Sequence, residues 1–302
     1  MRIGVMFGDR RGRGSLDELV SAARSLEARG FASLWLPQVL GFDAVTAAAV
    51  LGRETERIEI GTAVVPSYPR HPTALAQQAL TAAAACQGRF TLGVGLSHPV
   101  VIESLLGLSY ARRAAHMREY VAVLGPLLAG EPAAFAGEEF RVNLQLDVPG
   151  APKVPLLLAA LGDHMLQIAG RSANGTILWM TGPRTIEEHI APKLRAAAQE
   201  AGRPEPRIVA GCHVLLTNDP EGEGERLRKG MELYGTLPSY RAMIEKEGVG
   251  HPSELALLGD EQALDAALDR LRRVGVTDLE AVVMRADDGS DTRTLDYLES
   301  RI

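Results

Sequence analysis

Residues 57–95, RIEIGTAVVPSYPRHPTALAQQALTAAAACQGRFTLGVG, decide how this chain folds. A mostly apolar run over 57–65 ends at Pro66, and a second apolar run covers 90–95. Between them, Pro72 stands where the first turn of a helix tolerates proline, and apolar residues follow it at helical spacing. The segment therefore predicts a strand, a helix and a second strand, which is the unit from which parallel sheets are built.

The same alternation runs along the whole chain. The strands that we predict are short and nearly all apolar, as parallel strands buried on both faces should be, and they cover residues 2–7, 31–36, 57–65, 90–95, 154–160, 175–180, 207–216 and 279–283. Eight strands, each followed by a helix, favour a closed barrel over a doubly wound sheet. We therefore predict an α/β fold of the (β/α)8 TIM-barrel type, formed as one domain over residues 1–302.

Two stretches interrupt the alternation, after the fourth and seventh strands. The first holds a loop with a short helix at 99–108, a helix at 114–128 and an irregular hairpin at 133–148. The second, at 221–247, is charged and helical, and we expect it to be an insertion rather than a core element. Among the remaining helices, we predict a short one at 165–169.

The composition limits the classes of partner. The net charge of −6 argues against binding to nucleic acid or to an anionic membrane, and no apolar run approaches the roughly 18 residues of a membrane span. Cys86 and Cys212 have no metal-ligand spacing and form no disulfide framework, which suits a reducing compartment. No signal peptide is visible. We expect a cytoplasmic protein that acts on a small molecule and carries no metal.

Barrel enzymes place their active sites at the carboxyl ends of the strands. Here those ends are small and mostly neutral. They comprise Pro37, Gln38 and Val39; Thr62, Ala63 and Val64; Ser97 and His98; Ala159, Ala160, Leu161 and Gly162; Trp179, Met180, Thr181 and Gly182; and His213. We find no nucleophile elbow, no HExxH motif and no phosphate-binding loop ending in GKS or GKT. Such strand ends suit a bulky cofactor that carries its own chemistry.

Three histidines have two readings each. His98 follows the fourth strand and could donate a proton, or it could be an ordinary loop histidine. His213 lies on the face of its strand that we expect to point into the barrel, as a proton donor or as a core histidine bonded to a neighbour. His71 precedes Pro72 at a helix start, where a structural role is favoured.

A phosphate group could bind where Ala160, Leu161 and Gly162 open a helix, because the first amides of a helix are free to donate. The alternative is an ordinary turn. Asp163 complicates the first reading, because its carboxylate could cap the helix but would repel a phosphate. The nearby pair Gly93 and Gly95 lacks the third glycine of a dinucleotide fingerprint.

Several segments together give the chain a family resemblance. They are SLWLPQ at 33–38 with Asp43, GTAV at 61–64 running into YPRHP at 68–72, GVGLSH at 93–98, REY at 118–120 and ANG at 173–175. With these segments the chain resembles the luciferase-like monooxygenase superfamily, of bacterial-luciferase-like fold. Within it, the chain is similar to the branch that uses coenzyme F420, a deazaflavin.

The resemblance implies a site. It implies a non-proline cis peptide between Ala63 and Val64, on which the middle ring of the cofactor rests, with Thr62 as a third contact. It implies that Gln38, Ser97 and His98 lie near the ring. Ala159, Ala160 and Gly162 match the phosphate loop, with Met180 and Thr181 beside it, and the family is commonly dimeric.

Two positions depart from the family pattern. Asp163 stands where relatives often have proline or another uncharged residue. Gln38 stands where some sugar-phosphate dehydrogenases of the family have a catalytic histidine, which speaks against glucose-6-phosphate as the substrate.

The sequence therefore predicts an oxidoreductase that transfers a hydride between reduced coenzyme F420 and a small organic acceptor with an activated C=C or C=N bond. His98 is the first candidate for the proton donor and His213 the second. One alternative is an FMN-dependent monooxygenase of the same superfamily. Another is a non-catalytic barrel that binds a flavin or deazaflavin. A hydrolase or aldolase would need lysines and carboxylates that these strand ends lack.

Overall fold

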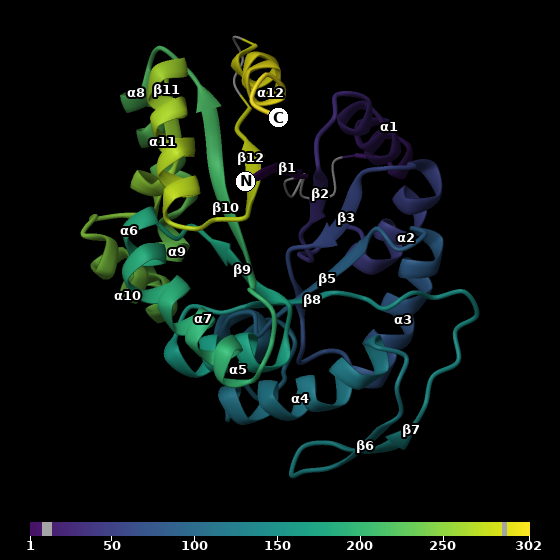
Figure 1. Ribbon diagram of the computed structural model, residues 1–302. Helices are drawn as coiled ribbons and strands as arrows, with labels where there is room; N and C mark the ends of the chain where they lie inside the picture. The colour runs from purple at the N-terminus through teal and green to yellow at the C-terminus, as the bar shows by residue number, and fades with distance from the viewer. Residues whose placement is uncertain (8–13, 286–288) are drawn as a thin grey trace.

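A computed structural model describes residues 1–7, 14–285 and 289–302, and it shows a closed parallel barrel (Figure 1). The barrel strands are β1 (Arg2–Met6), β2 (Ser33–Leu36), β3 (Glu59–Thr62), β5 (Phe90–Gly95), β8 (Leu156–Ala159), β9 (Gly175–Trp179), β10 (Arg207–Leu216) and β12 (Asp278–Val283). Each strand pairs with the next in this order, and β12 pairs with β1. The predicted (β/α)8 architecture is confirmed.

The helices lie outside this barrel, as Figure 1 shows. They are α1 (Leu16–Ala28), α2 (Ala44–Glu54), α3 (Pro72–Ala85), α4 (Arg113–Leu128), α5 (Asp163–Ser172), α6 (Pro183–Thr185) with η2 (Ile186–Ile190), α7 (Ala191–Glu200), α11 (Glu261–Arg273) and α12 (Ser290–Glu299). Helix α5 is twice as long as the predicted 165–169, because its first turn begins directly after the capping residue Gly162. His71 caps α3 through its side chain, as its structural reading predicts.

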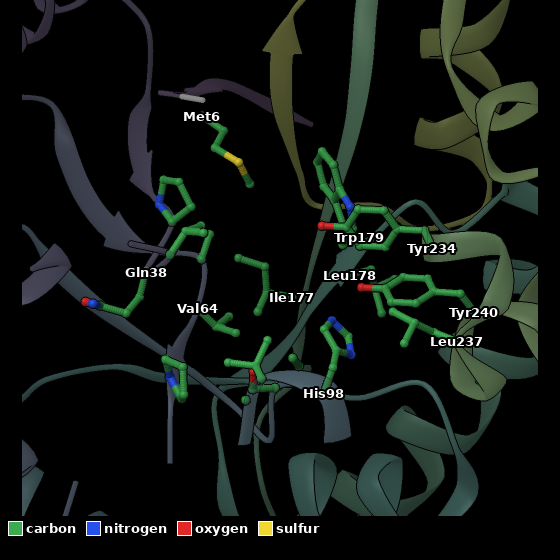
Figure 2. A pocket seen from close by; sticks show the side chains of 18 of the residues that line it. Met6, Gln38, Val64, His98, Ile177, Leu178, Trp179, Tyr234, Leu237 and Tyr240 are labelled. Atoms are coloured by element: carbon green, nitrogen blue, oxygen red, sulfur yellow. The ribbon is translucent and has the colours of Figure 1, made fainter. Parts of the chain in front are cut away.

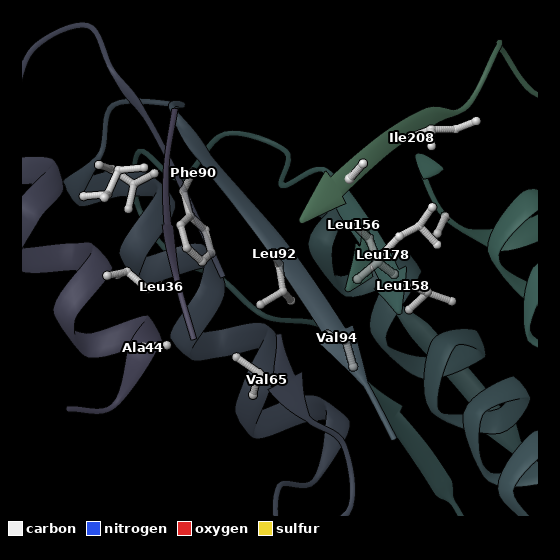
Figure 3. Packing of buried hydrophobic residues seen from close by; sticks show 14 of the residues in the cluster. Leu36, Ala44, Val65, Phe90, Leu92, Val94, Leu156, Leu158, Leu178 and Ile208 are labelled. Atoms are coloured by element: carbon white, nitrogen blue, oxygen red, sulfur yellow. The ribbon is translucent and has the colours of Figure 1, made fainter. Parts of the chain in front are cut away.

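The main hydrophobic core lies between the strands and the helices. Outward-facing side chains such as Leu92, Leu156 and Ile208 are buried there (Figure 3). Helices α2 and α3 approach closely, since a Cβ on Gly52 would lie only 2.2 Å from the sulfur of Cys86. The strands are continuously apolar because one face of each strand packs on the helices and the other faces the barrel interior.

The third predicted strand, at 57–65, is interrupted. It divides into β3 and the short β4 (Val65–Pro66), and the Ala63–Val64 peptide between them is cis. The hydroxyl of Thr62 donates to the carbonyl of Gly93 and accepts from its amide, both at 2.9 Å. The prediction of one continuous strand is therefore wrong, and the cis peptide implied by the family resemblance is confirmed.

The insertion after the fourth strand agrees with the prediction. It contains the π-helix η1 (Val100–Leu105) and an antiparallel hairpin of β6 (Ala133–Ala136) and β7 (Arg141–Leu144), which stands away from the barrel in Figure 1.

The insertion after the seventh strand differs from the prediction. It contains α8 (Pro220–Gly230), α9 (Glu232–Thr236), α10 (Pro238–Glu247), η3 (Pro252–Leu255) and β11 (Leu257–Gly259), a short strand that pairs with β10 and was not predicted. Leu227, Met231 and Met243 of this insertion belong to the main core. The expectation that 221–247 lies outside the core is wrong, because its few apolar residues share one buried side.

The barrel interior is closed at its amino-terminal end. Trp35 is fully buried and packs with Leu157, Ile177 and Val209 in a second apolar cluster. A Cβ on Gly61 would lie 2.3 Å from the indole ring of Trp35, so the glycine makes room for the ring. The space available to a ligand therefore lies toward the carboxyl ends of the strands.

Polar side chains lie at that closed end of the barrel. Arg207 binds Glu59 and Asp278, each at 2.9 Å, and Arg2 binds the same two carboxylates at its edge. Over the residues that the structure describes, no helix has both the length and the apolar character to cross a membrane.

Candidate active site

A large pocket opens at the carboxyl ends of the strands. Its volume is about 1940 Å³, larger than the roughly 300–1,000 Å³ of a typical small-ligand site. Strand ends on all sides of the barrel contribute to its lining, and so do the insertions after the fourth and seventh strands. This size leaves room for a cofactor and a second molecule together.

One wall of the pocket is the bulge between β3 and β4. Ala63 and Val64 line it, joined by the cis peptide. A Cβ on Gly95 would lie 2.7 Å from Cγ2 of Val64 and 3.1 Å from the Cβ of Ala159, so this glycine lets the bulge approach β5 and β8. Thr62 is fully buried and holds the bulge from behind through Gly93, rather than facing the pocket.

The opposite wall is aromatic. His98 lies 5.8 Å from the ring of Tyr240 and 6.3 Å from that of Tyr234, between ring centroids. Figure 2 shows both tyrosines across the pocket from Val64 and Ile177. Burial lowers the pKa of His98, so its imidazole is neutral at pH 7 and keeps one N–H to donate. Ser97 precedes it with a φ of 63°, and the hydroxyl of Tyr110 donates to its carbonyl at 2.7 Å.

The start of helix α5 forms the third side of the site. Ala159, Ala160 and Gly162 line the pocket, and among the described residues no side chain caps the helix at Gly162. The carboxylate of Asp163 accepts from Lys193 at 2.6 Å, and this bond lowers the pKa of Asp163. Asp163 is therefore charged, but a cation beside it offsets the repulsion that a phosphate would meet.

Three predicted cofactor contacts do not direct their side chains into the pocket. Gln38 borders the pocket, but its side-chain oxygen accepts from the amide of Ala44 at 2.8 Å, and Figure 2 shows the side chain directed away. Met180 is buried behind the lining. The hydroxyl of Thr181 donates to the carbonyl of Trp179 at 3.3 Å. Their assignment as cofactor contacts stays a prediction.

His213 faces the pocket, as the alternation along β10 predicts. Its ring lies 5.2 Å from that of Trp179. Burial lowers its pKa to about 4, so the ring is neutral at pH 7. Among the described residues its Nδ1 has no hydrogen-bond partner, which does not match a core histidine bonded through that atom.

Among the lining residues that the sequence did not suggest as candidates are Tyr234, Tyr240 and Glu280. Glu280 is only 1% exposed, and burial raises its pKa well above the usual range. A lone acidic residue inside an apolar strand was the available signal for it. The two tyrosines belong to the charged insertion, where no periodic pattern distinguishes them.

The pocket suits a large planar group. It has an apolar bulge on one side, aromatic rings on the other and an uncapped helix start between. In the described ranges, no three or more His, Cys, Asp or Glu side chains are grouped to hold a metal ion. Fold and site together define a (β/α)8 barrel with a large, mostly apolar pocket at the carboxyl ends of its strands.

Comparison with known proteins gives the family. The profile of the family described as luciferase-like monooxygenase matches residues 1–281. The chain therefore belongs to the luciferase-like monooxygenase family, and it is an oxidoreductase.

A relative and two solved structures refine this placement. The chain is 28% identical, over 94% of its length and 85% of the relative's, to a Mycobacterium tuberculosis protein provisionally named a coenzyme F420-dependent oxidoreductase, Rv3520c. Its fold is similar to that of the F420-dependent tetrahydromethanopterin reductase from Methanopyrus kandleri, with a TM-score of 0.82 at 18% identity, over 100% of this chain and 98% of the other. It is also similar to the FMN complex of a type II Baeyer–Villiger monooxygenase from Pseudomonas putida, with a TM-score of 0.77 at 15% identity, over 99% and 96%.

Proposed function

We propose that this protein is an F420-dependent oxidoreductase that transfers a hydride between the reduced deazaflavin and a small organic acceptor. The observation that carries the proposal is a large pocket lined by the apolar side chains of Ala63 and Val64 on one side and by aromatic rings on the other. The name of the Mycobacterium tuberculosis relative supports F420 as the cofactor.

The chain's own residues would hold the cofactor in two places. Ala63 and Val64 would support the ring, with Gly95 allowing their close approach. The free amides after Gly162 would donate to the phosphate, with Lys193 offsetting Asp163. When bound, the deazaflavin supplies or accepts the hydride.

A proton must accompany the hydride, and His98 is placed to hold it. Its ring lies in the aromatic wall opposite the bulge, and it retains one N–H in its neutral form. His213 is the second candidate, because its pKa of about 4 lies well below pH 7. We propose an activated C=C or C=N bond as the acceptor, positioned between the aromatic wall and the bulge.

FMN is the second candidate cofactor, favoured by the similar fold of the FMN-bound monooxygenase. A barrel that binds its cofactor without catalysis is the third possibility. Fluorescence titration of the purified protein with F420, FMN and FAD distinguishes them. We expect tight binding of F420 and weak binding of FMN. Binding of FMN alone would overturn the proposal, and binding of F420 with no acceptor-dependent oxidation of its reduced form would favour the non-catalytic reading.

We also infer a cytoplasmic homodimer that acts on small molecules and not on nucleic acid. The net charge of −6 supports the last point. Exposed apolar side chains after β2, with Leu40 at 85% exposure, support a contact with a second copy. Light scattering on the wild type and on Leu40→Glu tests the dimer, and a monomeric wild type would exclude it.

A further inference from the structure

Three polar atoms at one side of the pocket lack partners. Among the described residues, Oε1 of Glu280, Nδ1 of His213 and Nε1 of Trp179 are buried and make no hydrogen bond. All three residues line the pocket. Buried polar atoms in proteins are nearly always bonded, so three orphaned atoms on one wall indicate that a ligand supplies the missing partners.

The register of the strands brings these side chains together. Gly211 of β10 pairs with Glu280 of β12 on one side and with Trp179 of β9 on the other. A Cβ on Gly211 would lie 2.9 Å from Oε2 of Glu280 and 3.0 Å from Cε3 of Trp179. Both side chains therefore use the space that the glycine leaves open. The ring of His213, two residues further along β10, lies 5.2 Å from that of Trp179.

The charge of this group points to an uncharged ligand. Glu280 is buried and its Oε1 has no partner among the described residues, so burial raises its pKa and favours the protonated form, which donates an O–H. The indole of Trp179 donates an N–H, and His213 is neutral. The nearest arginine along the same face of β10, Arg207, is already bound to Glu59 and Asp278. No cation of this group would compensate an anionic ligand, whereas neutral polar groups on three adjacent strands match a carbonyl oxygen.

We propose that Glu280, Trp179 and His213 form a hydrogen-bonding subsite that binds the carbonyl oxygen of an uncharged ketone or enone. This deepens the proposed function, on which it rests for its catalytic meaning: the C=C bond of an enone is activated by the carbonyl group that the subsite holds. A substrate carrying a carboxylate at this position is disfavoured.

Ligand-observed NMR on the protein without added cofactor tests the subsite, with cyclohexanone as the probe and cyclohexanecarboxylate as the charged control of the same ring. We expect cyclohexanone to bind and the carboxylate not to bind. Glu280→Leu, which removes the donor, should weaken cyclohexanone about tenfold, as expected for loss of a buried hydrogen bond. Glu280→Gln, which keeps a donor, should stay within about threefold of the wild type.

Trp179→Phe keeps the ring, removes the N–H and supplies a second test if Glu280→Leu fails to fold. It should weaken cyclohexanone by about threefold or more. No binding of cyclohexanone to the wild type, tighter binding of the carboxylate, or equal affinity in the wild type and the folded variants lacking a donor would overturn the subsite.

F420 fluorescence titration of the same variants separates this proposal from the proposed function. We expect Glu280→Leu to bind F420 within about twofold of the wild type, since a single lost hydrogen bond would cost more than that. If the wild type binds no F420, the proposed function fails while the ketone measurement still decides the subsite. If Glu280→Leu weakens F420 as strongly as cyclohexanone, the residue contacts the cofactor and the subsite is wrong.

Discussion

The two ends of the barrel use the same strands in opposite ways. At the amino-terminal end, Arg207 of β10 and Asp278 of β12 bind each other at 2.9 Å. Arg207 also binds Glu59, and Arg2 binds both carboxylates. Further along the same two strands, Glu280 of β12 and His213 of β10 each have a buried polar atom without a hydrogen-bond partner among the described residues. The contrast shows that buried polar groups which satisfy one another hold the barrel together, whereas those left unsatisfied face the pocket.

The largest loss of stability should come from removing a carboxylate of the ion-pair network at the amino-terminal end. Asp278→Asn removes a carboxylate that is 1% exposed and leaves Arg207 with only one anion. We expect a loss of about 3 kcal/mol in the free energy of unfolding by urea, because a buried ion-pair network loses one of its two carboxylates and Arg207 keeps only Glu59. The control, Asp269→Asn, breaks an exposed pair with Arg272 and should cost less than about 1 kcal/mol. Equal losses would remove the contrast between the ends.

The second effect concerns pH at the unsatisfied end. His213 has a pKa of about 4 in the folded protein, against 6.5 in the unfolded chain. As pH falls from about 6.5 to 4, the unfolded chain binds a proton that the folded protein does not, so stability should fall by up to about 3 kcal/mol. His213→Gln should lack this part of the pH dependence. The exposed His164 is the control, and a profile in which His164→Gln and His213→Gln coincide would contradict the buried site.

The third prediction tests the space that Gly211 leaves for the side chains of Glu280 and Trp179. Gly211→Ala places a methyl group 2.9 Å from Glu280 and should destabilise the protein by about 2 kcal/mol through overpacking. Gly125→Ala, in helix α4, where the added Cβ meets nothing within 4 Å beyond its own helix backbone and chain neighbours, should change stability by less than about 1 kcal/mol. Thermal unfolding of both variants is the measurement. A harmless Gly211→Ala would mean that Glu280 and Trp179 do not meet there.

The last prediction concerns Glu280 itself and is a change in how stability depends on pH. The folded pKa of Glu280 is raised, so above the unfolded value near 4.3 the unfolded chain releases a proton that the folded protein keeps, and stability falls as pH rises through that window. Glu280→Gln removes this loss. Its stability relative to the wild type should therefore improve progressively as pH rises from 4 to 7. An unchanged difference across that range would mean that Glu280 is ionised in the fold.

Much of the fold follows from the sequence because it depends on local periodicity. Strands 90–95 and 207–216 have the predicted bounds. The three-residue strand β11 was missed because its pattern is too short to stand out. The break at Ala63–Val64 came from the family resemblance alone, since those residues are as apolar as the strand around them.

The candidate site was predicted where it depends on strand ends and missed where it depends on register. Ala63, Val64, Ser97, His98 and His213 line the pocket as expected. Glu280 becomes significant only beside Gly211 of a neighbouring strand, and Tyr240 only through the packing of its insertion. Single-strand patterns contain neither relation.

Trp35 and Gly61 have a consequence for redesign of this enzyme. The indole ring of Trp35 fills the volume that the glycine leaves open, directly beneath Ala63 and Val64. One complementary pair of volumes therefore supports Ala63 and Val64, which line the pocket. Exchanging the two sizes, with a smaller residue at 35 and a larger one at 61, offers a way to move this support while leaving the rim unchanged.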